Sequence, residues 1–157
     1  MEREGTVEGV FLAPDSGEAM RPVDDVEAVA DRGLRGDRYF HERGLYDERD
    51  DLPEGADVTL IEREALDRAA ADYDLELDPS ETRRNLLTRA VPLNHLVDRE
   101  FRVGEALLVG RRLCEPCGYM ESLAEVEGAE RALVHRGGLE ADVVESGEIA
   151  VGDAVRF

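Results

Sequence analysis

A glycine turn occurs twice in this sequence, each time ahead of a strand-like run. Val103–Leu107 and Val151–Val155 share one order of residues, namely apolar, glycine, acidic, alanine and apolar. Each segment predicts a tight turn that leads into a strand. Short apolar runs such as 58–61 and 106–109 recur along the chain. Because helical periodicity is rare beside these runs, the sequence predicts a mainly β fold, a twisted antiparallel barrel rather than a parallel α/β sheet.

The individual elements follow from periodicity and turn residues. We expect strands at Gly5–Ala13, Val23–Ala30, Val58–Ile61, Ala106–Leu113, Ala141–Val144 and Ala154–Phe157, and an extended segment over Ser80–Thr88. The clearest helical pattern covers Glu62–Tyr73, with one face formed by Leu66, Ala69, Ala70 and Tyr73. A second helix is expected within Tyr119–His135, and loops are expected at 31–40, 47–57 and 92–95.

Length and hydropathy bound the class of protein. A chain of 157 residues corresponds to one ordinary domain, so we expect a single domain over residues 1–157. The first residues lack the apolar core of a signal peptide, and no stretch approaches membrane-spanning length. These observations predict a cytoplasmic protein without a membrane partner. In that reducing compartment the two cysteines are expected to be thiols.

The charge is strongly one-sided. Acidic residues outnumber basic ones by 38 to 19, the formal net charge is −19, and every basic residue is an arginine. An acidic surface without lysine is typical of adaptation to concentrated salt, so we expect a halophilic source. The same negative charge repels phosphate backbones and argues against nucleic acid as a partner.

The salt hypothesis makes a direct prediction. The melting temperature should rise steeply from low to multimolar salt, because the screening length falls to about 3 Å at 1 M and carboxylate repulsion is suppressed. A salt series of thermal melts measures this, and a flat melting temperature across that range would remove the halophile interpretation.

Cys114-Glu115-Pro116-Cys117 is the first candidate for chemistry. A zinc site needs four ligands, and His41, His95 and His135 show no ligand spacing beyond the cysteine pair. A dithiol redox pair is an alternative, although the βαβ pattern of thioredoxin-like proteins is missing. A third alternative is one reactive thiolate, a metal ligand or sulfur carrier, and both cysteines can also be simple buried residues. Pro116 and Gly118 place Cys117 on a turn, where its thiol can be presented.

Two further segments suggest an anion pocket. Thr82-Arg83-Arg84-Asn85 combines two guanidinium groups, which match phosphate and carboxylate oxygens, with an amide. Gly33-Leu34-Arg35-Gly36-Asp37-Arg38 contains glycines that allow the backbone to approach a ligand closely. The simpler alternatives are arginines paired with surface carboxylates and an ordinary tight turn. His41 is a further possible proton donor beside such a pocket.

Taken in order, these segments resemble the MOSC domain, named for the C-terminal domain of molybdenum cofactor sulfurases. The resemblance rests on residues 33–38, 81–88, 101–106, Glu115-Pro116-Cys117 and the closing segment 147–155, and spans essentially the whole chain. It implies a β-barrel with peripheral helices and a pocket for molybdopterin, the pterin of the molybdenum cofactor. In the family the cysteine that matches Cys117 is a molybdenum ligand in amidoxime-reducing relatives and a proposed sulfur carrier in others.

The resemblance also assigns the other site residues. It implies that Arg84 and Asn85 anchor the cofactor, and we group with them Arg83, Gly36, Asp37 and Arg38. It implies a cysteine desulfurase or an electron-donor protein as partner, and reduction of N-hydroxylated compounds as a possible reaction. Full-length sulfurases also carry a pyridoxal phosphate domain, for which this chain has neither the length nor a lysine. From these assignments we expect Arg84→Ala and Asn85→Ala to weaken cofactor binding and to leave the fold intact.

Overall fold

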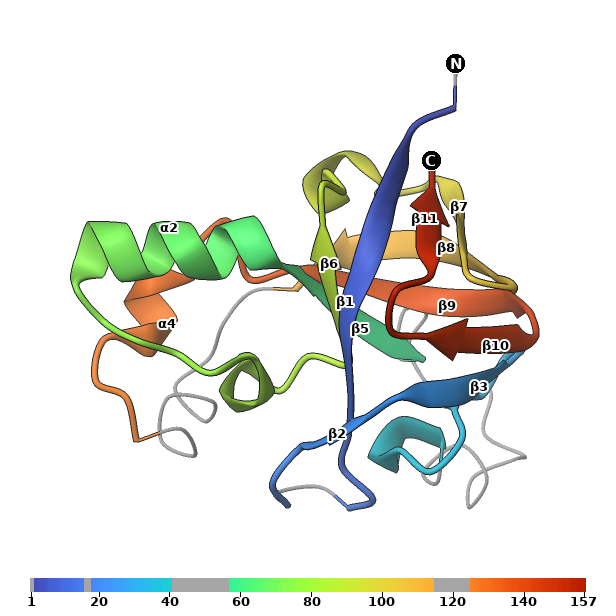
Figure 1. The fold of residues 1–157 in the computed structure, drawn as a ribbon, viewed down its shortest axis with the longest axis horizontal. Coiled ribbons are helices and arrows are strands. Elements are labelled where there is room, and N and C mark those ends of the chain that lie inside the picture. The colour runs from blue at the N-terminus through green and yellow to red at the C-terminus, as the bar shows by residue number, and fades with distance from the viewer. Residues whose placement is uncertain (1, 16–17, 41–56, 115–124) are drawn as a thin grey trace.

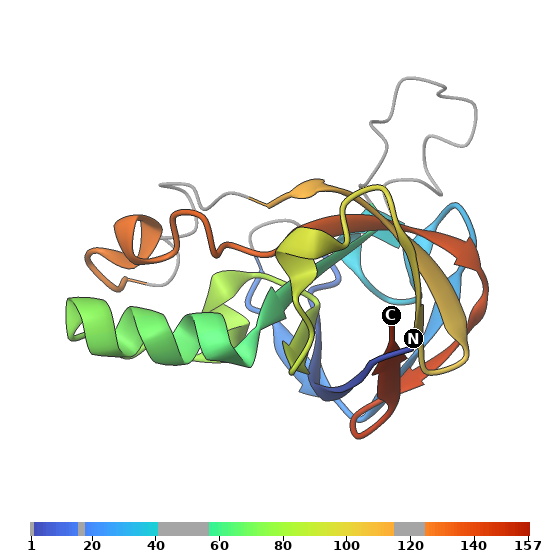
Figure 2. The same cartoon turned by 90° about the horizontal axis from the view of Figure 1, so that it is seen from above.

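A sheet that closes on itself forms the body of the protein (Figure 1). The computed structural model describes residues 2–15, 18–40, 57–114 and 125–157. Its barrel strands are β1 (Glu4–Leu12), β5 (Val58–Glu62), β6 (Leu86–Arg89), β7 (Glu100–Val103), β8 (Ala106–Leu113), β9 (Leu139–Glu145) and β11 (Ala154–Arg156), with β2 (Arg21–Val23) beyond β1 at the edge. The order β11-β7-β8-β9-β5-β6-β1 closes because β11 also pairs with β1. Viewed from above, these strands make a ring with the helices on one side (Figure 2).

The prediction of a mainly β antiparallel barrel is confirmed, with one parallel pair. Strands β5 and β6 run parallel, with Leu60 opposite Leu86, whereas the other barrel neighbours are antiparallel. A parallel pair needs a long crossover, and here it contains α2 (Arg63–Tyr73) and the 3-10 helix η1 (Pro79–Thr82). The predicted extended segment Ser80–Thr88 is therefore wrong in its first part, where a capping box at Asp78 and Glu81 starts η1.

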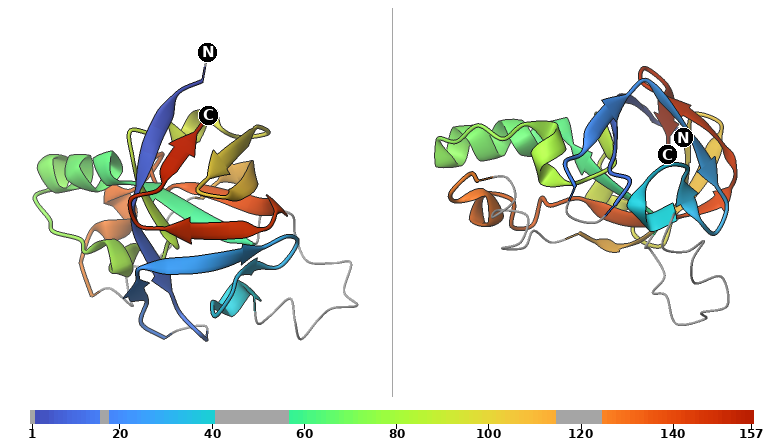
Figure 3. Two further views of the ribbon diagram at one scale, coloured as in Figure 1. Left: turned by 45° about the vertical axis from the view of Figure 1, so that its right-hand side comes forward. Right: turned by 90° about the horizontal axis from the view of Figure 1, so that it is seen from below.

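A second sheet covers the end of the barrel opposite the chain termini (Figure 3). It consists of β10 (Gly147–Ala150), β3 (Asp25–Val29) and β4 (Gly33–Leu34). The predicted single strand Val23–Ala30 is in fact two strands, because the chain leaves β1 after Val23 and pairs with β10 from Asp25 onward. Both predicted glycine turns are confirmed, with positive φ at Gly104 and Gly152 directly before β8 and β11.

Two apolar clusters hold these layers together. The first fills the barrel, and its fully buried members include Leu60, Leu86, Phe101, Leu108 and Leu139. The second lies between the barrel wall and the helices α2 and α4 (Ala129–Ala132) and includes Ile61, Leu66, Ala69, Leu87 and Leu133. Strands β5 and β6 serve both clusters because successive side chains point to opposite faces of a strand. The helices are thereby fixed against one side of the barrel (Figures 1 and 2).

The expected helix is confirmed, and one of its expected contacts is wrong. Leu66 and Ala69 are buried and Ala70 is half-buried, but Tyr73 is 43% exposed. The Tyr73 ring instead lies 5.9 Å from the Arg136 guanidinium, because it stands in the last turn beyond the apolar cluster. The second expected helix is represented by α4, and residues 119–124 of its range lie outside the described part of the chain. Among the described residues, no helix has the length and apolar character needed to cross a membrane.

The last residue of the acidic loop expected at 47–57 is buried rather than exposed to solvent. Residues 47–56 lie outside the described structure, whereas Asp57 is 1% exposed. Its Oδ2 accepts a hydrogen bond from the Val143 N–H at 3.0 Å, which joins the start of β5 to β9. An acidic run in the sequence cannot reveal that its last carboxylate is used to satisfy a buried backbone donor.

Glu62, the residue before α2, gives a stability prediction. Burial, reinforced by the nearby charge of Glu64, raises the pKa of Glu62 above its usual 4.5. An acid whose pKa is raised on folding destabilises the folded state once it is ionised, and contributes nothing once both states are protonated. Glu62→Gln should therefore raise the melting temperature at neutral pH, and the gain should vanish as the pH falls below 4.5. Thermal melts over a range of pH measure this, with Glu127→Gln, a change at an exposed glutamate, as the control. A gain in melting temperature that persists at low pH would contradict the prediction.

Candidate functional site

Arg38 joins two segments that the sequence had selected separately. Its guanidinium Nη2 donates to the carbonyl oxygen of Arg83 at 3.2 Å, across 45 residues of chain. The same side chain is only 6% exposed, and its Nη1 donates to the Met20 sulfur at 3.2 Å and to Asp37 Oδ1 at 3.3 Å. The structure therefore brings the 36–38 segment and the 83–85 segment into contact, as the anion-pocket hypothesis requires.

Asp37 anchors this loop to the end of β1. Its side chain is fully buried, Oδ1 accepts from the Ala13 N–H at 3.0 Å, and Oδ2 accepts from the Tyr39 N–H at 3.4 Å. The Arg38 N–H completes the link by donating to the Ala13 carbonyl at 2.7 Å. Gly36, with φ of +94°, makes the turn that leads into this pair. These contacts make Asp37 and Arg38 a buried ion pair that positions the loop.

Asn85 has a comparable positioning role between two strands. It is fully buried, and its Oδ1 accepts from the Thr59 N–H at 3.0 Å and the Thr59 hydroxyl at 3.1 Å. Its Nδ2 donates to the Phe11 carbonyl at 3.1 Å, so one amide connects the end of β1 with the start of β5. We therefore now expect Asn85→Ala to lower the stability of the fold, because the substitution would leave buried backbone groups unsatisfied.

Arg84 lies beside the end of the strand that leads to the cysteines. Its side chain is buried, with the residue 8% exposed, and Nε donates to the Gly137 carbonyl at 2.8 Å. The next carbonyl, that of Gly138, accepts from the Cys114 N–H at 2.7 Å. The Arg84 side chain and the Cys114 N–H thus donate hydrogen bonds to two consecutive carbonyls. The Arg84 guanidinium therefore lies close to the end of β8, from which the chain continues toward Cys117.

The segment 137–138 positions Arg84, and the sequence analysis did not single it out. Gly138 has φ of +112°, and a Cβ at this position would stand 2.0 Å from the Leu60 carbonyl oxygen. Only glycine permits this close approach to β5, and the approach places the Gly137 carbonyl within reach of Arg84. The signal was present in the sequence as a Gly-Gly pair directly before an apolar strand.

Arg83 occupies the turn between η1 and β6. It is half-buried, its φ is +62°, and its Nη1 donates to the Glu18 carbonyl at 2.5 Å. The left-handed backbone at Arg83 ends η1 and turns the chain toward Asn85. Arg83 and Arg84 are therefore adjacent in sequence but contact different parts of the chain, Glu18 and Gly137.

The cysteines are only partly described. Cys114 is 7% exposed, which agrees with the expectation that it continues the apolar strand. Cys117, the predicted metal ligand, and His41 lie outside the described residues. Within residues 2–15, 18–40, 57–114 and 125–157, no group of three or more acidic, histidine or cysteine side chains is placed to hold a metal ion. The guanidinium groups of Arg38, Arg83 and Arg84 donate to backbone carbonyls, and Arg38 also donates to Asp37.

Comparison with known proteins defines the family. The MOSC domain family model matches residues 47–156. Three solved structures show the same fold. The YuaD protein from Bacillus subtilis is 16% identical, with a TM-score of 0.77, and the alignment covers 99% of this chain and 96% of that one. YiiM from Escherichia coli is 19% identical, with a TM-score of 0.69, and the alignment covers 98% of this chain and 68% of that one. YiiM from Geobacillus stearothermophilus is 12% identical, with a TM-score of 0.65, and the alignment covers 96% of this chain and 71% of that one.

The structural neighbours support the fold alone, since their identities are low, and none of the curated proteins matches this chain. The family match is the stronger finding because it covers well over half of the sequence. The MOSC family is associated with the molybdenum cofactor and with molybdenum cofactor sulfurase-like function. This chain belongs to the MOSC domain family.

Proposed function

We propose that the protein binds the molybdenum cofactor, or carries its sulfur, at the junction of the 36–38, 83–85 and 137–138 segments. Cys117 is the metal ligand or sulfur carrier, and Arg84 and Arg83 provide positive charge for the anionic part of the cofactor. Asp37, Arg38 and Asn85 hold the surrounding backbone in place. When bound, the cofactor would supply a molybdenum centre, for which a soft thiolate is a suitable ligand.

One observation carries this proposal. The buried Arg84 guanidinium and the Cys114 backbone bond to the neighbouring carbonyls of Gly137 and Gly138, at 2.8 and 2.7 Å. Two segments that the sequence separates by about thirty residues therefore meet at one place, and Cys117 follows Cys114 by three positions. A positive charge near a thiol also favours its reactive thiolate form.

The leading enzymatic role is reduction of N-hydroxylated compounds. Such a reaction cleaves the N–O bond, consumes two electrons and two protons, and releases water, so it requires an electron-donor protein. The rival role is a non-enzymatic carrier that delivers sulfur or cofactor to a partner such as a cysteine desulfurase complex. Reduction of the bound metal by a donor separates the two roles, since a carrier has no need of it.

Cys114 is a buried thiol, and the resolving cysteine of a dithiol pair can also be buried, so the dithiol alternative stays open. A redox pair needs at least one thiolate at the surface and a partner thiol that can reach it. Cys114 is 7% exposed and its N–H is fixed to Gly138 at the end of β8. These contacts are compatible with a structural role for Cys114, and the proposal assigns the chemistry to Cys117.

The anchoring role of Arg84 can be measured directly. Arg84→Met removes the charge, and Arg84→Lys keeps the charge without the planar fork. We expect Arg84→Met to lower the affinity for the pterin cofactor at least about tenfold, because a hydrogen bond to a charged group contributes about 1.5–3 kcal/mol. Fluorescence of the pterin released from protein expressed in a cofactor-producing host gives the occupancy.

Two controls make the result interpretable. Arg68→Met removes an exposed arginine of α2 that pairs with Asp72, and it should load as the wild type does. Arg84→Lys should load to an intermediate level, and it replaces Arg84→Met in the test if thermal melts show that the loss of the Gly137 contact unfolds the protein. Wild-type loading by a folded Arg84 variant would contradict the anchoring role.

A further inference from the structure

Two pockets lie beside the chain termini, and the termini are at the end of the barrel away from η1 (Figure 1). Each pocket has a volume of about 560 Å³. Both are lined by Arg3, Pro92 and Phe157, so the two pockets adjoin along these residues and are called the hollow below. None of the residues assigned to the cofactor lines it, so the hollow is separate from the proposed cofactor site.

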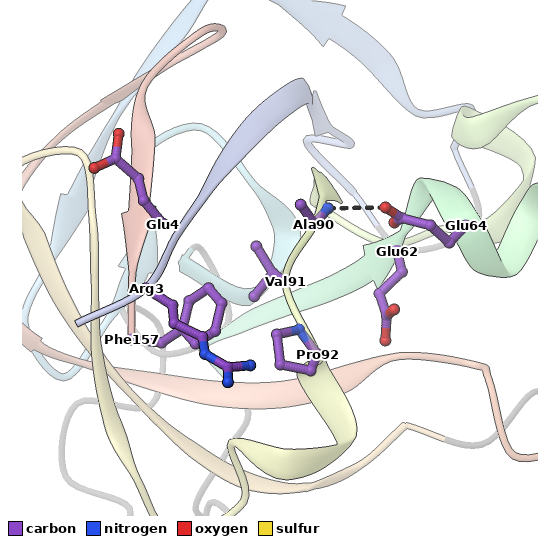
Figure 4. Close-up of a pocket in the computed structure, with 8 residues that line it drawn as sticks. All are labelled: Arg3, Glu4, Glu62, Glu64, Ala90, Val91, Pro92 and Phe157. Carbon is purple, nitrogen blue, oxygen red and sulfur yellow. Dashed lines mark hydrogen bonds between the residues drawn. The ribbon is translucent and has the colours of Figure 1, made fainter. Parts of the chain in front are cut away.

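The shared wall of the hollow is built rigidly. The Arg3 N–H donates to the Phe157 carbonyl at 2.7 Å, and the Phe157 N–H donates to the Arg3 carbonyl at 2.9 Å. The Phe157 side chain is half-buried and packs against the barrel core. Figure 4 shows the Phe157 ring and the Arg3 guanidinium lying beside Pro92. With buried Leu96, these groups give an apolar surface next to the positive charge of Arg3.

The charge on one side of the hollow is unusual for this protein. Arg3, His95 and Arg99 line that side, and Glu100 is the single carboxylate among its lining residues. Arginines elsewhere are commonly ion-paired, as Arg156 is with Glu4 at 3.8 Å and Arg89 is with Glu8. Among the described residues, no side-chain ion pair or hydrogen bond involves Arg3 or Arg99, although both line this side of the hollow. Arg3 and Arg99 thus place two positive charges without ion pairs beside the same hollow, in a protein whose net charge is −19. Such a pair of charges indicates a binding place for an anion.

The other side of the hollow ends in an acid. Glu62, Glu64 and Glu4 line it. Glu64 accepts from the Ala90 N–H at 2.8 Å, Glu4 pairs with Arg156, and Glu62 has a backbone hydrogen bond with Leu93 that leaves the rest of its carboxyl facing the pocket. Figure 4 shows the Glu62 carboxyl on the far side of Val91 from Arg3. Half-buried Glu62, with its raised pKa, holds a proton more readily than an exposed glutamate and can accept or donate a hydrogen bond. Positive charge, apolar surface and this carboxyl therefore follow one another along the hollow.

We propose that this hollow binds a small aromatic carboxylic acid that carries an amino or hydroxyl group at the end opposite its carboxylate. The carboxylate lies against Arg3 and Arg99, the ring lies on Phe157 and Pro92, and the amino or hydroxyl group meets Glu62. A ligand of this class uses every kind of surface that the hollow presents. Inorganic phosphate would contact only the two arginines. Aniline would contact the apolar surface and Glu62 but has no anionic group for the arginines.

The test uses the full chain with no added residues at either end, at the lowest salt at which it stays folded. Calorimetric titration compares four probes, 4-aminobenzoate, benzoate, aniline and inorganic phosphate. We expect 4-aminobenzoate to bind most tightly, benzoate more weakly, and phosphate and aniline least. The double substitution Arg3→Ala/Arg99→Ala removes both exposed cations and should lower the affinity for 4-aminobenzoate at least about tenfold. Glu62→Leu, which removes the hydrogen-bonding group, should remove most of the difference between 4-aminobenzoate and benzoate.

The matched control is Arg21→Ala, which removes an exposed arginine from the edge strand β2, outside the hollow. It should bind 4-aminobenzoate as the wild type does, and this comparison separates a local contact from a change in net charge. The proposal is overturned if no probe binds, if phosphate binds as tightly as 4-aminobenzoate, or if the double variant binds as tightly as Arg21→Ala. Because none of these substitutions touches the cofactor site, the outcome is independent of the proposed function.

Discussion

Replacing Cys117 with serine is expected to abolish loading of both molybdenum and sulfane sulfur. A hydroxyl is a poor ligand for a sulfur-rich metal centre compared with a thiolate, and it forms no persulfide. Cys114→Ser should load as the wild type does and should lower only the stability, because Cys114 is a buried residue at the end of β8. Each variant is incubated with the cofactor or a persulfide donor, and bound molybdenum and sulfane sulfur are then measured.

The two cysteine variants act as controls for each other. Both must show the circular dichroism of the wild type before their loading is compared. Normal loading of Cys117→Ser would remove the central functional claim. Equal failure of two folded variants would instead support a two-thiol redox mechanism through Cys114 and Cys117.

Asn85→Ala is expected to cause the largest loss of stability among the site substitutions. The change removes the acceptor for the Thr59 N–H and hydroxyl and the donor to the Phe11 carbonyl, while Thr59 stays buried. A buried polar group left without a partner costs about 1–3 kcal/mol, so the free energy of unfolding should fall by about 2–4 kcal/mol. Chemical denaturation in the salt concentration that stabilises the wild type measures the difference.

Asn94→Ala is the matched control for this prediction. Asn94 is exposed, and its side chain makes one hydrogen bond, to the His135 carbonyl at 3.1 Å. Its replacement should change the free energy of unfolding by less than about 1 kcal/mol. Similar small losses in the two variants would show that Asn85 does not connect β1 and β5 as the structure indicates.

The barrel could be predicted because its signals are local. Glycine turns and short apolar runs determine where β8 and β11 begin, and the apolar run 58–61 becomes β5, which is buried on both faces. The errors arose where a distant partner decides the outcome. Asp24 divides a strand-like run because its two halves pair with β1 and β10, and Tyr73 is exposed because the helix extends past its packing surface.

The site was predictable in its residues more than in their roles. The arginines, Asn85 and the glycine-containing loop stand out by residue type, and the structure does connect the loop with Arg83 through Arg38. Their division into positioning and anchoring groups depends on contacts such as Asn85 with Phe11, across 74 residues, which no local pattern encodes. The 137–138 segment was overlooked for the same reason, since its importance comes from the approach to β5 and Arg84.

The most direct test of the account is the molybdenum and pterin content of the protein purified from its native host. The account predicts that both are present in equimolar amounts with the chain, or that sulfane sulfur is bound to Cys117 in their place. Both forms should be lost from Cys117→Ser produced in the same host. Wild-type protein that carries neither pterin nor sulfane sulfur would contradict the proposed cofactor or sulfur-handling function.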